Sequence, residues 1–327
     1  MADGYELGTV DAAEGILRDL YVELRRKVRA WSELTQQTPQ ARMGYVGQHL
    51  VSAVTGFPGG RSGARGKDLV LPHGEHAEIK TCSRVDQLGS CQECEARVSS
   101  IEPECPECGS EKIARKDDSK WLIAVPSEAE LKNIFESKYY YFVLFDFAKF
   151  KDASDINARI WRVDPRSKAF AYCLVDYFRN IRSKSSSKAP FNLWPFMLKF
   201  DLLAAELIFH AEISEDDEIV THLFDGVRGE GSLEPLPALG TYARSGGAEL
   251  DVTTLVAVAE HLDIELSEVR KRGILEQIEI SRRDRQLDDA ALIDVLCDAL
   301  YGRRIMDHLS DLPPGVVGPS FVLPPVG

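Results

Sequence analysis

Four cysteines close together constrain this sequence more than any other feature. Cys91 and Cys94 form one CxxC motif, and Cys105 and Cys108 form a second one after a gap of ten residues. Each motif presents two thiolates to one ion, and four sulfurs complete the tetrahedral coordination of a structural Zn²⁺ site. The spacing therefore predicts a zinc ribbon, with an iron centre or free cysteines as alternatives. Four sulfur ligands leave no position for water, so we expect a structural zinc.

The other three cysteines, Cys82, Cys173 and Cys297, are scattered among apolar neighbours. Disulfide-rich proteins distribute their cysteines more evenly, so the pattern indicates a metal site in a reducing compartment. The first residues lack a basic start followed by an apolar run, and no stretch of about 18 apolar residues occurs. We therefore expect a cytoplasmic protein without a membrane segment. With 327 residues, of which 44% are hydrophobic, the chain can form two or three domains.

The formal net charge of −13 excludes a protein that coats nucleic acid over its whole surface. Local contact with DNA remains open, because basic residues concentrate in four runs: Arg25–Arg29, Arg61–Lys67, Arg179–Lys188 and Arg270–Arg285. The alternative for each run is a solvated helix face or loop. Six glutamates make the cysteine region acidic, so we expect it to brace the loop after Lys80 or to form a protein interface.

Apolar spacing predicts helices over 10–34 and 39–54, the second ending at Gly56. Two strand-like runs, 67–72 and 75–81, are joined at Pro72-His73-Gly74, which is typical of a hairpin. After the cysteine region we expect a strand over 121–125, a helix over 127–137, strands over 139–147 and 156–163, and a helix over 167–181. The segment 182–196 is a basic, serine-rich loop, and 233–247 is a linker.

The hairpin over 67–81 holds the candidate catalytic residues Asp68, Glu78 and Lys80. If its centre is His73, residues whose numbers sum to 146 lie opposite each other, which places Asp68 and Glu78 about 5 Å apart. Glu78 and Lys80 project from one face, because side chains alternate along a strand. Two facing carboxylates repel unless a cation lies between them, and Mg²⁺ suits such ligands. Lys80 would then orient or activate a water molecule.

The spacing of this motif alone is common by chance. The chain also contains Glu130-x-Lys132, Glu136-x-Lys138 and Asp118-x-Lys120. The first two fall within or at the end of an expected helix, where residues two apart point in different directions, and the third falls in a charged turn. An exposed charged hairpin remains the alternative for Asp68, Glu78 and Lys80.

With this motif and the order helix, three strands, helix, strand, the sequence resembles the PD-(D/E)XK nuclease superfamily. Lys67 stands where that family often has proline, and Gln48 stands where many members have glutamate. The resemblance implies a catalytic place for Gln48, as a ligand of a metal-bound water, and a glutamine on the helix surface is the alternative. A cysteine-rich insertion after the motif lysine and a helical C-terminal region resemble restriction enzymes of the MamI type. The implied fold class is α/β (α+β), a restriction-endonuclease-like mixed sheet flanked by helices, with an inserted zinc ribbon and a helical C-terminal domain.

We expect a helical region over 1–38, a nuclease core over 39–232 with the ribbon at 86–116, a helical domain over 248–311 and a tail over 312–327. Residues 258–275 resemble a helix-turn-helix in which Asp263 occupies the turn, where glycine is usual, and Ser267 would cap the second helix. An auxiliary or dimer-forming helical pair is the alternative. The candidate DNA contacts are Arg61, Arg65, Lys184, Lys188, Asn192, Arg270, Lys271 and Arg272.

The resemblance implies a type II restriction endonuclease, a Mg²⁺-dependent hydrolase that cuts double-stranded DNA. We expect it to act as a homodimer on a palindromic site, with a cognate DNA methyltransferase as its partner in the same system. Two alternatives stay open. One is a repair or recombination nuclease that recognises DNA structure, and the other is a non-catalytic regulator that binds DNA through the zinc ribbon and the helix-turn-helix.

Overall fold

The structure is a computed structural model that describes residues 4–37, 39, 41–60, 67–85, 88–99, 102, 104–114, 121–149, 152–167, 170–171, 174–175, 177–184, 186, 190–193, 205–226, 232–233 and 252–287. The chain divides into two compact units. The first comprises Met1–Trp121, Tyr139–Arg162 and Glu206–Ser232. The second comprises Leu122–Lys138, Val163–Ala205 and Leu233–Gly327.

The first unit begins with one continuous helical segment, as the apolar spacing predicts. It consists of α1 (Val10–Ile16), a π-helical turn (Leu17–Val22) and α2 (Glu23–Thr35). The Thr9 side chain caps α1 by accepting a hydrogen bond from the Ala12 N–H at 3.2 Å. The next helix, α3 (Gly44–Thr55), starts five residues later than expected. Its predicted end is confirmed, because Gly56 terminates it with a φ of 78°.

A seven-stranded mixed sheet forms the centre of this unit. Its order is β1 (Leu69–Val70), β2 (His76–Ser83), β7 (Tyr139–Lys149), β8 (Asp152–Val163), β10 (Glu206–Ile213) and β11 (Ile219–Phe224), and β12 (Ser232–Leu233) also pairs with β10. β2 and β7 are parallel, with Ala77 opposite Tyr139, while β1–β2, β8–β10 and β10–β11 are antiparallel. The predicted strands 75–81, 139–147 and 156–163 are confirmed, and 67–72 is shortened to two residues. The result is an α+β fold built on a curled mixed sheet.

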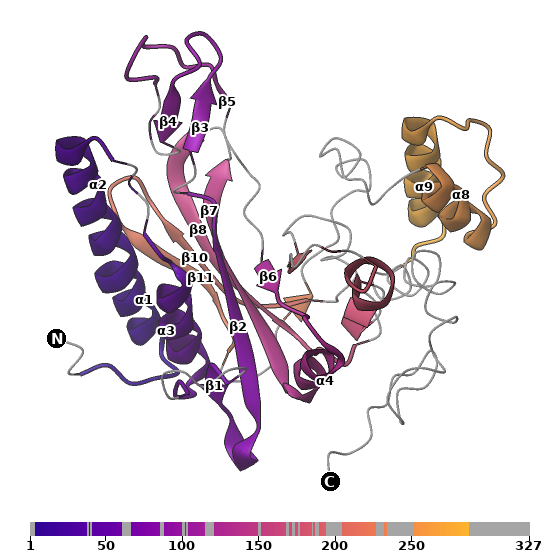
Figure 1. The fold of residues 1–327 in the computed structure, drawn as a ribbon, viewed down its shortest axis with the longest axis horizontal. Coiled ribbons are helices and arrows are strands. Elements are labelled where there is room, and N and C mark those ends of the chain that lie inside the picture. The colour runs from indigo at the N-terminus through magenta and orange to yellow at the C-terminus, as the bar shows by residue number, and fades with distance from the viewer. Residues whose placement is uncertain are drawn as a thin grey trace. The chain divides into compact units, whose positions relative to one another are not determined.

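The main core lies between the helices and one face of the sheet. α1, α2 and α3 run along that face (Figure 1). Alternate residues of β7, namely Tyr141, Val143 and Phe145, pack into this core. Tyr21 stacks on Phe145 with ring centroids 4.3 Å apart, and each such fully buried side chain contributes roughly 1.5–3 kcal/mol. This packing holds α3 against β2, the strand that contains Glu78 and Lys80.

The second unit contains α4 (Glu128–Glu136), which confirms the helix expected over 127–137. The Ser127 side chain caps it by accepting from the Glu130 N–H at 3.3 Å. β6 (Trp121–Ile123) and β9 (Phe191–Leu193) pair as a two-stranded sheet, and a π-helical turn covers Tyr177–Arg182. The predicted linker 233–247, except Leu233, and the tail 312–327 lie outside the described residues. In the part of the chain that the structure describes, no helix is long and apolar enough to cross a membrane.

The predicted helical pair is present as α8 (Val252–His261) and α9 (Lys271–Asp284). Asp263 adopts a φ of 49°, a conformation that explains why glycine is usual at such a turn. The expected cap by Ser267 is wrong, because α9 begins three residues later and its N-cap residue is Arg270. Instead, the Ser267 N–H and hydroxyl both donate to Gln277 Oε1 at 2.9 Å, which ties the connecting segment to α9.

Candidate functional site

The hairpin that carries the motif has the register expected from the sequence. Leu69 pairs with Ala77 and Val70 pairs with His76. The turn is a short 3-10 segment, Pro72–Gly74, in which His73 (φ 61°) and Gly74 (φ 78°) both take the left-handed conformation. This register fixes the position of Asp68, which directly precedes β1, beside the middle of β2.

Asp68 is held through both of its carboxylate oxygens. The backbone N–H of Ile79 donates to Asp68 Oδ2 at 2.9 Å. Gln48 Nε2, from α3, donates to Asp68 Oδ1 at 2.9 Å. The structure thus brings Gln48 and Asp68 together from elements twenty residues apart in the sequence.

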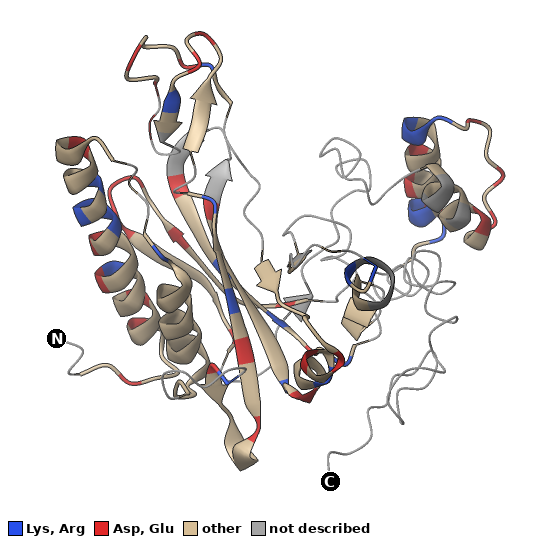
Figure 2. Ribbon diagram, viewed as in Figure 1, with Lys and Arg blue, Asp and Glu red and all other residues tan. Residues whose placement is uncertain are grey.

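Glu78 and Lys80 project from the same face of β2, as the alternation predicts. Lys80 Nζ lies 2.5 Å from Glu78 Oε1, and the two side chains are only 25% and 13% exposed. Ala77 and Ile79 point to the other face and pack into the main core. In Figure 2 the acidic and basic segments of β2 lie next to each other in the middle of the strand.

Glu78 is in an environment that disfavours its charge. Burial raises the pKa of this carboxyl, the neighbouring Lys80 ammonium opposes that rise, and Asp68 adds to it. Glu78 Oε2 is buried and has no hydrogen-bond partner among the described residues. A buried carboxylate oxygen without a partner is costly, and a cation would compensate for it. Asp68 and Glu78 offer the oxygen ligands that Mg²⁺ prefers, so these residues fit that ion.

Two glycines allow the backbone to approach this site closely. A Cβ at Gly47 would lie 1.9 Å from Thr81 Oγ1, so α3 packs on β2 at the residue before Gln48. A Cβ at Gly60 would lie 1.9 Å from the Lys67 carbonyl oxygen, and the Gly60 N–H donates to the Asp68 carbonyl at 2.9 Å. The sequence interpretation did not identify either residue. A glycine inside an expected helix was the available signal at position 47.

The four cysteines form a second site within the first unit. Sγ of Cys91 lies 3.6 Å from Sγ of Cys108, and Sγ of Cys94 lies 3.5 Å from Sγ of Cys105. All four sulfur atoms lie within 4.8 Å of one another. They are carried by a three-stranded sheet of β4 (Arg97–Ser99), β3 (Leu88–Cys91) and β5 (Ile113–Ala114). This geometry matches the predicted ribbon and suits one tetrahedral ion.

The two CxxC motifs have equivalent backbones. The N–H of Glu95 donates to the Cys91 carbonyl at 3.1 Å, and the N–H of Gly109 donates to the Cys105 carbonyl at 2.8 Å. Glu95 (φ 61°) and Gly109 (φ 69°) both take the left-handed conformation. Backbone N–H groups of Cys94 and Glu93 lower the pKa of the Cys91 thiol to about 6. The pKa values of Cys94 and Cys108 are raised, so Cys91 is the thiol of this group that ionises most readily.

The face of the sheet that bears Glu78 also carries a second group of polar side chains. The sequence did not predict this group. Arg159 Nη2 donates to Asp146 Oδ2 at 2.8 Å, and burial raises the pKa of Asp146. His210 Nε2 lies 2.9 Å from Asn157 Oδ1, and burial, with Arg159 and His222 nearby, lowers the pKa of His210 to about 4. No short motif could reveal this group, because its members come from four different strands.

The candidate DNA contacts belong to several parts of the chain. Lys184 is exposed, and Asn192 lies in β9. Arg270, Lys271 and Arg272 lie at the start of α9, where Arg270 and Arg272 are 88% and 91% exposed. Arg61, Arg65 and Lys188 lie outside the described residues.

Comparison with known proteins identifies a family. A family model described as MamI restriction endonuclease matches residues 30–238, which is more than half of the chain. The matched region contains the hairpin, Gln48 and all four clustered cysteines. The chain matches no curated protein and no solved structure.

Proposed function

Because the chain belongs to the MamI restriction endonuclease family, we propose that it is a Mg²⁺-dependent type II endonuclease with its active site at Asp68, Glu78 and Lys80. The substrate is double-stranded DNA and the reaction is phosphodiester hydrolysis. The observation that supports this assignment is the buried Glu78 Oε2, which has no hydrogen-bond partner in the described structure. The other oxygen of Glu78 lies 2.5 Å from Lys80 Nζ, and Asp68 is near enough to raise the pKa of Glu78.

Asp68 and Glu78 are the proposed Mg²⁺ ligands. A bound Mg²⁺ supplies a Lewis acid for the scissile phosphate and lowers the pKa of a coordinated water. Lys80, 2.5 Å from Glu78, keeps its ammonium beside the ion site, where it orients the attacking water and neutralises charge on the phosphoryl oxygens. Water adds to phosphorus as one P–O bond breaks, and the leaving oxygen takes up a proton.

Gln48 is a positioning residue in this proposal. Its amide donates to Asp68 Oδ1, while the Ile79 N–H donates to the other oxygen. Together the two hydrogen bonds fix the plane of the Asp68 carboxylate and leave lone pairs on both oxygens for a cation. If Mg²⁺ is bound there, the amide oxygen of Gln48 would be a further acceptor for one of its water molecules.

The four-cysteine cluster is the proposed site of one structural Zn²⁺. Four sulfurs within 4.8 Å of one another fill a tetrahedral shell, so this ion takes no part in the cleavage step. In this reading the chain has a PD-(D/E)XK core over 39–232, with the ribbon inserted at 86–116, and a helical domain over 248–311. Two copies would act together on a palindromic site that a cognate methyltransferase protects.

DNA contact is proposed for the basic residues outside the active site. The exposed Lys184, with Arg61, Arg65 and Lys188, would contact phosphates, and Asn192 would contact a base edge. Arg270, Lys271 and Arg272 would approach the duplex from the start of α9.

Incubation of the purified chain with unmodified plasmid DNA and Mg²⁺ tests the proposal. Discrete fragments are expected, whereas ragged or structure-dependent products would indicate a repair-type nuclease, and intact DNA would contradict catalysis. Asp68→Ala should abolish cutting and Lys80→Ala should slow it about 100- to 1,000-fold, in both cases without changing the zinc content. Lys132→Ala is the matched control, because Glu130-x-Lys132 has the same spacing but lies in α4, where Lys132 is 68% exposed. Normal cutting by Asp68→Ala would rule out this site.

A further inference from the structure

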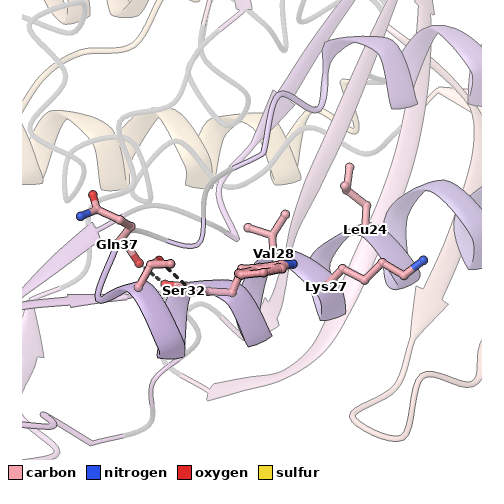
Figure 3. A pocket seen from close by; sticks show the side chains of 7 residues that line it. Leu24, Lys27, Val28, Ser32 and Gln37 are labelled. Atoms are coloured by element: carbon pink, nitrogen blue, oxygen red, sulfur yellow. Dashed lines mark hydrogen bonds between the residues drawn. The ribbon is translucent and has the colours of Figure 1, made fainter.

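One side of α2 is apolar and exposed. None of its thirteen residues is fully buried, although Leu24, Val28 and Trp31 recur at helical spacing. Leu24 and Val28 are half-buried, and Leu24 packs partly against the main core. Trp31 is 64% exposed. These side chains form a shallow groove of about 380 Å³ lined by Leu24, Lys27, Val28, Trp31, Ser32, Thr35 and Gln37. Figure 3 shows Leu24 and Val28 pointing to the same side of the helix. An exposed apolar stripe of this kind indicates a partner.

A lysine on the rim of this groove is available for an ionic contact. Arg26 pairs with Glu23 and with Asp217, and Arg29 pairs with Glu33 at 3.4 Å. Lys27, by contrast, makes no ion pair within the described residues and lines the groove directly. The groove therefore offers an apolar floor with one uncompensated positive charge, which suits a small acidic partner.

The cysteine ribbon has the complementary chemistry. We define the ribbon tip as residues 104–109, the turn around the second CxxC motif. In this tip Cys105 is buried, whereas Glu104, Pro106, Glu107 and Cys108 are exposed. Glu93, elsewhere on the ribbon, is already paired with Lys112 at 2.7 Å, whereas Glu104 and Glu107 make no ion pair among the described residues. The tip thus presents two acidic groups on either side of an exposed proline ring.

We propose that the groove on α2 binds the ribbon tip of a second copy of this chain. Pro106 packs against Leu24, Val28 and Trp31, and Glu107 pairs with Lys27. Two-fold symmetry repeats the contact, so the dimer buries twice the area of one contact. This is needed because a stable interface buries roughly 800 Å² on each partner, and one contact of this size buries less. The inference rests on the proposed function only in requiring that two copies act together. DNA is a poorer occupant, since a duplex backbone presents several phosphates and the groove lining contains one basic residue, Lys27.

Sedimentation velocity of the full chain over a range of concentrations tests this pairing. Lys27→Glu and Glu107→Lys are each expected to raise the dimer dissociation constant about tenfold, because each ion pair occurs twice. The double variant, Lys27→Glu with Glu107→Lys, restores the pair with reversed polarity and is expected to recover most of the affinity. Glu215→Lys, an exposed charge reversal on the β10–β11 turn, is the matched control and should not change the dissociation constant.

A monomer at all concentrations, or a double variant weaker than either single one, would overturn the proposal. So would a Lys27→Glu variant that dimerises normally but binds DNA less tightly, because the groove would then be a DNA surface. These outcomes are independent of cleavage. A chain that dimerises with charge-swap rescue and does not cut DNA would refute the nuclease assignment and leave this interface standing.

Discussion

Replacing Gly47 with alanine is expected to slow DNA cleavage without touching any proposed catalytic group. The new Cβ would lie 1.9 Å from Thr81 Oγ1 and 2.8 Å from Thr81 Cγ2. Atoms in normal contact are about 3.5 Å apart, so α3 and β2 must separate by about 1.5 Å or Thr81 must rotate. The next residue, Gln48, moves with the helix, and its 2.9 Å hydrogen bond to Asp68 is lost.

The size of both effects follows from this geometry. Overpacking costs about 1–3 kcal/mol, and the better helix propensity of alanine offsets up to about 1 kcal/mol. With the full offset, the free energy of unfolding is therefore expected to fall by no more than about 2 kcal/mol. A displacement of about 1 Å at a catalytic group lowers the rate on the order of 100-fold. The loss of activity thus exceeds what the loss of folded protein explains.

Urea unfolding followed by circular dichroism measures the first effect, and a timed plasmid assay at low temperature measures the second. Gly44→Ala is the matched control, because a Cβ at this position of the same helix has nothing within 4 Å. It should retain both stability and activity. Adding Thr81→Ala to Gly47→Ala removes the two closest contacts and is expected to restore part of the rate. A Gly47→Ala variant that matches the wild type in both assays would refute the reasoning.

Three further outcomes are expected. Lys80→Ala should reduce the single-turnover cleavage rate about 100- to 1,000-fold, since it removes one charge that stabilises the transition state, and a loss under tenfold contradicts that role. Burial raises the pKa of Glu78 in the folded protein above its value in the unfolded chain. Without Mg²⁺, the free energy of unfolding should therefore fall as the pH rises from the pKa of Glu78 in the unfolded chain to its higher pKa in the folded protein. Urea titrations across that range should show the fall in the wild type and not in Glu78→Gln, and Mg²⁺ should raise the unfolding temperature of the wild type alone. Cys105→Ser should lose stoichiometric zinc in elemental analysis, and retention of about one zinc per chain would contradict the four-sulfur site.

The sequence was sufficient to predict the helices and the strands β2, β7 and β8 of the first unit, but it predicted neither β10 nor β11. Alternation in 75–81 and helical spacing in 10–34 are local properties, and they survive because burial against the core reinforces them. The hairpin register was also predictable, since a short turn at Pro72–Gly74 leaves few ways to pair the flanking residues. The start of α3 and the cap of α9 were less predictable, because helix ends depend on a few local hydrogen bonds.

The candidate site was predicted where its residues share one hairpin, as Asp68, Glu78 and Lys80 do. The close packing that supports it was not predicted, because Gly47 and Thr81 meet only when α3 is placed on β2. The same reason applies to Asp146 and Arg159, which come from neighbouring strands. The four-cysteine cluster was the opposite case, since its residues lie within one short segment and the spacing of the two CxxC motifs predicts that they meet.

The parallel pairing of β2 with β7 has a consequence for how the chain acquires its structure. Ala77 and Tyr139 are about sixty residues apart, so the pairing must close a long loop before the strands gain any contact energy. The cysteine ribbon occupies part of that loop. An ion that gathers the four thiolates early shortens the free length of the loop, so zinc supply should set the refolding rate as well as the final stability. Refolding kinetics with and without added zinc would then differ in the forward rate constant.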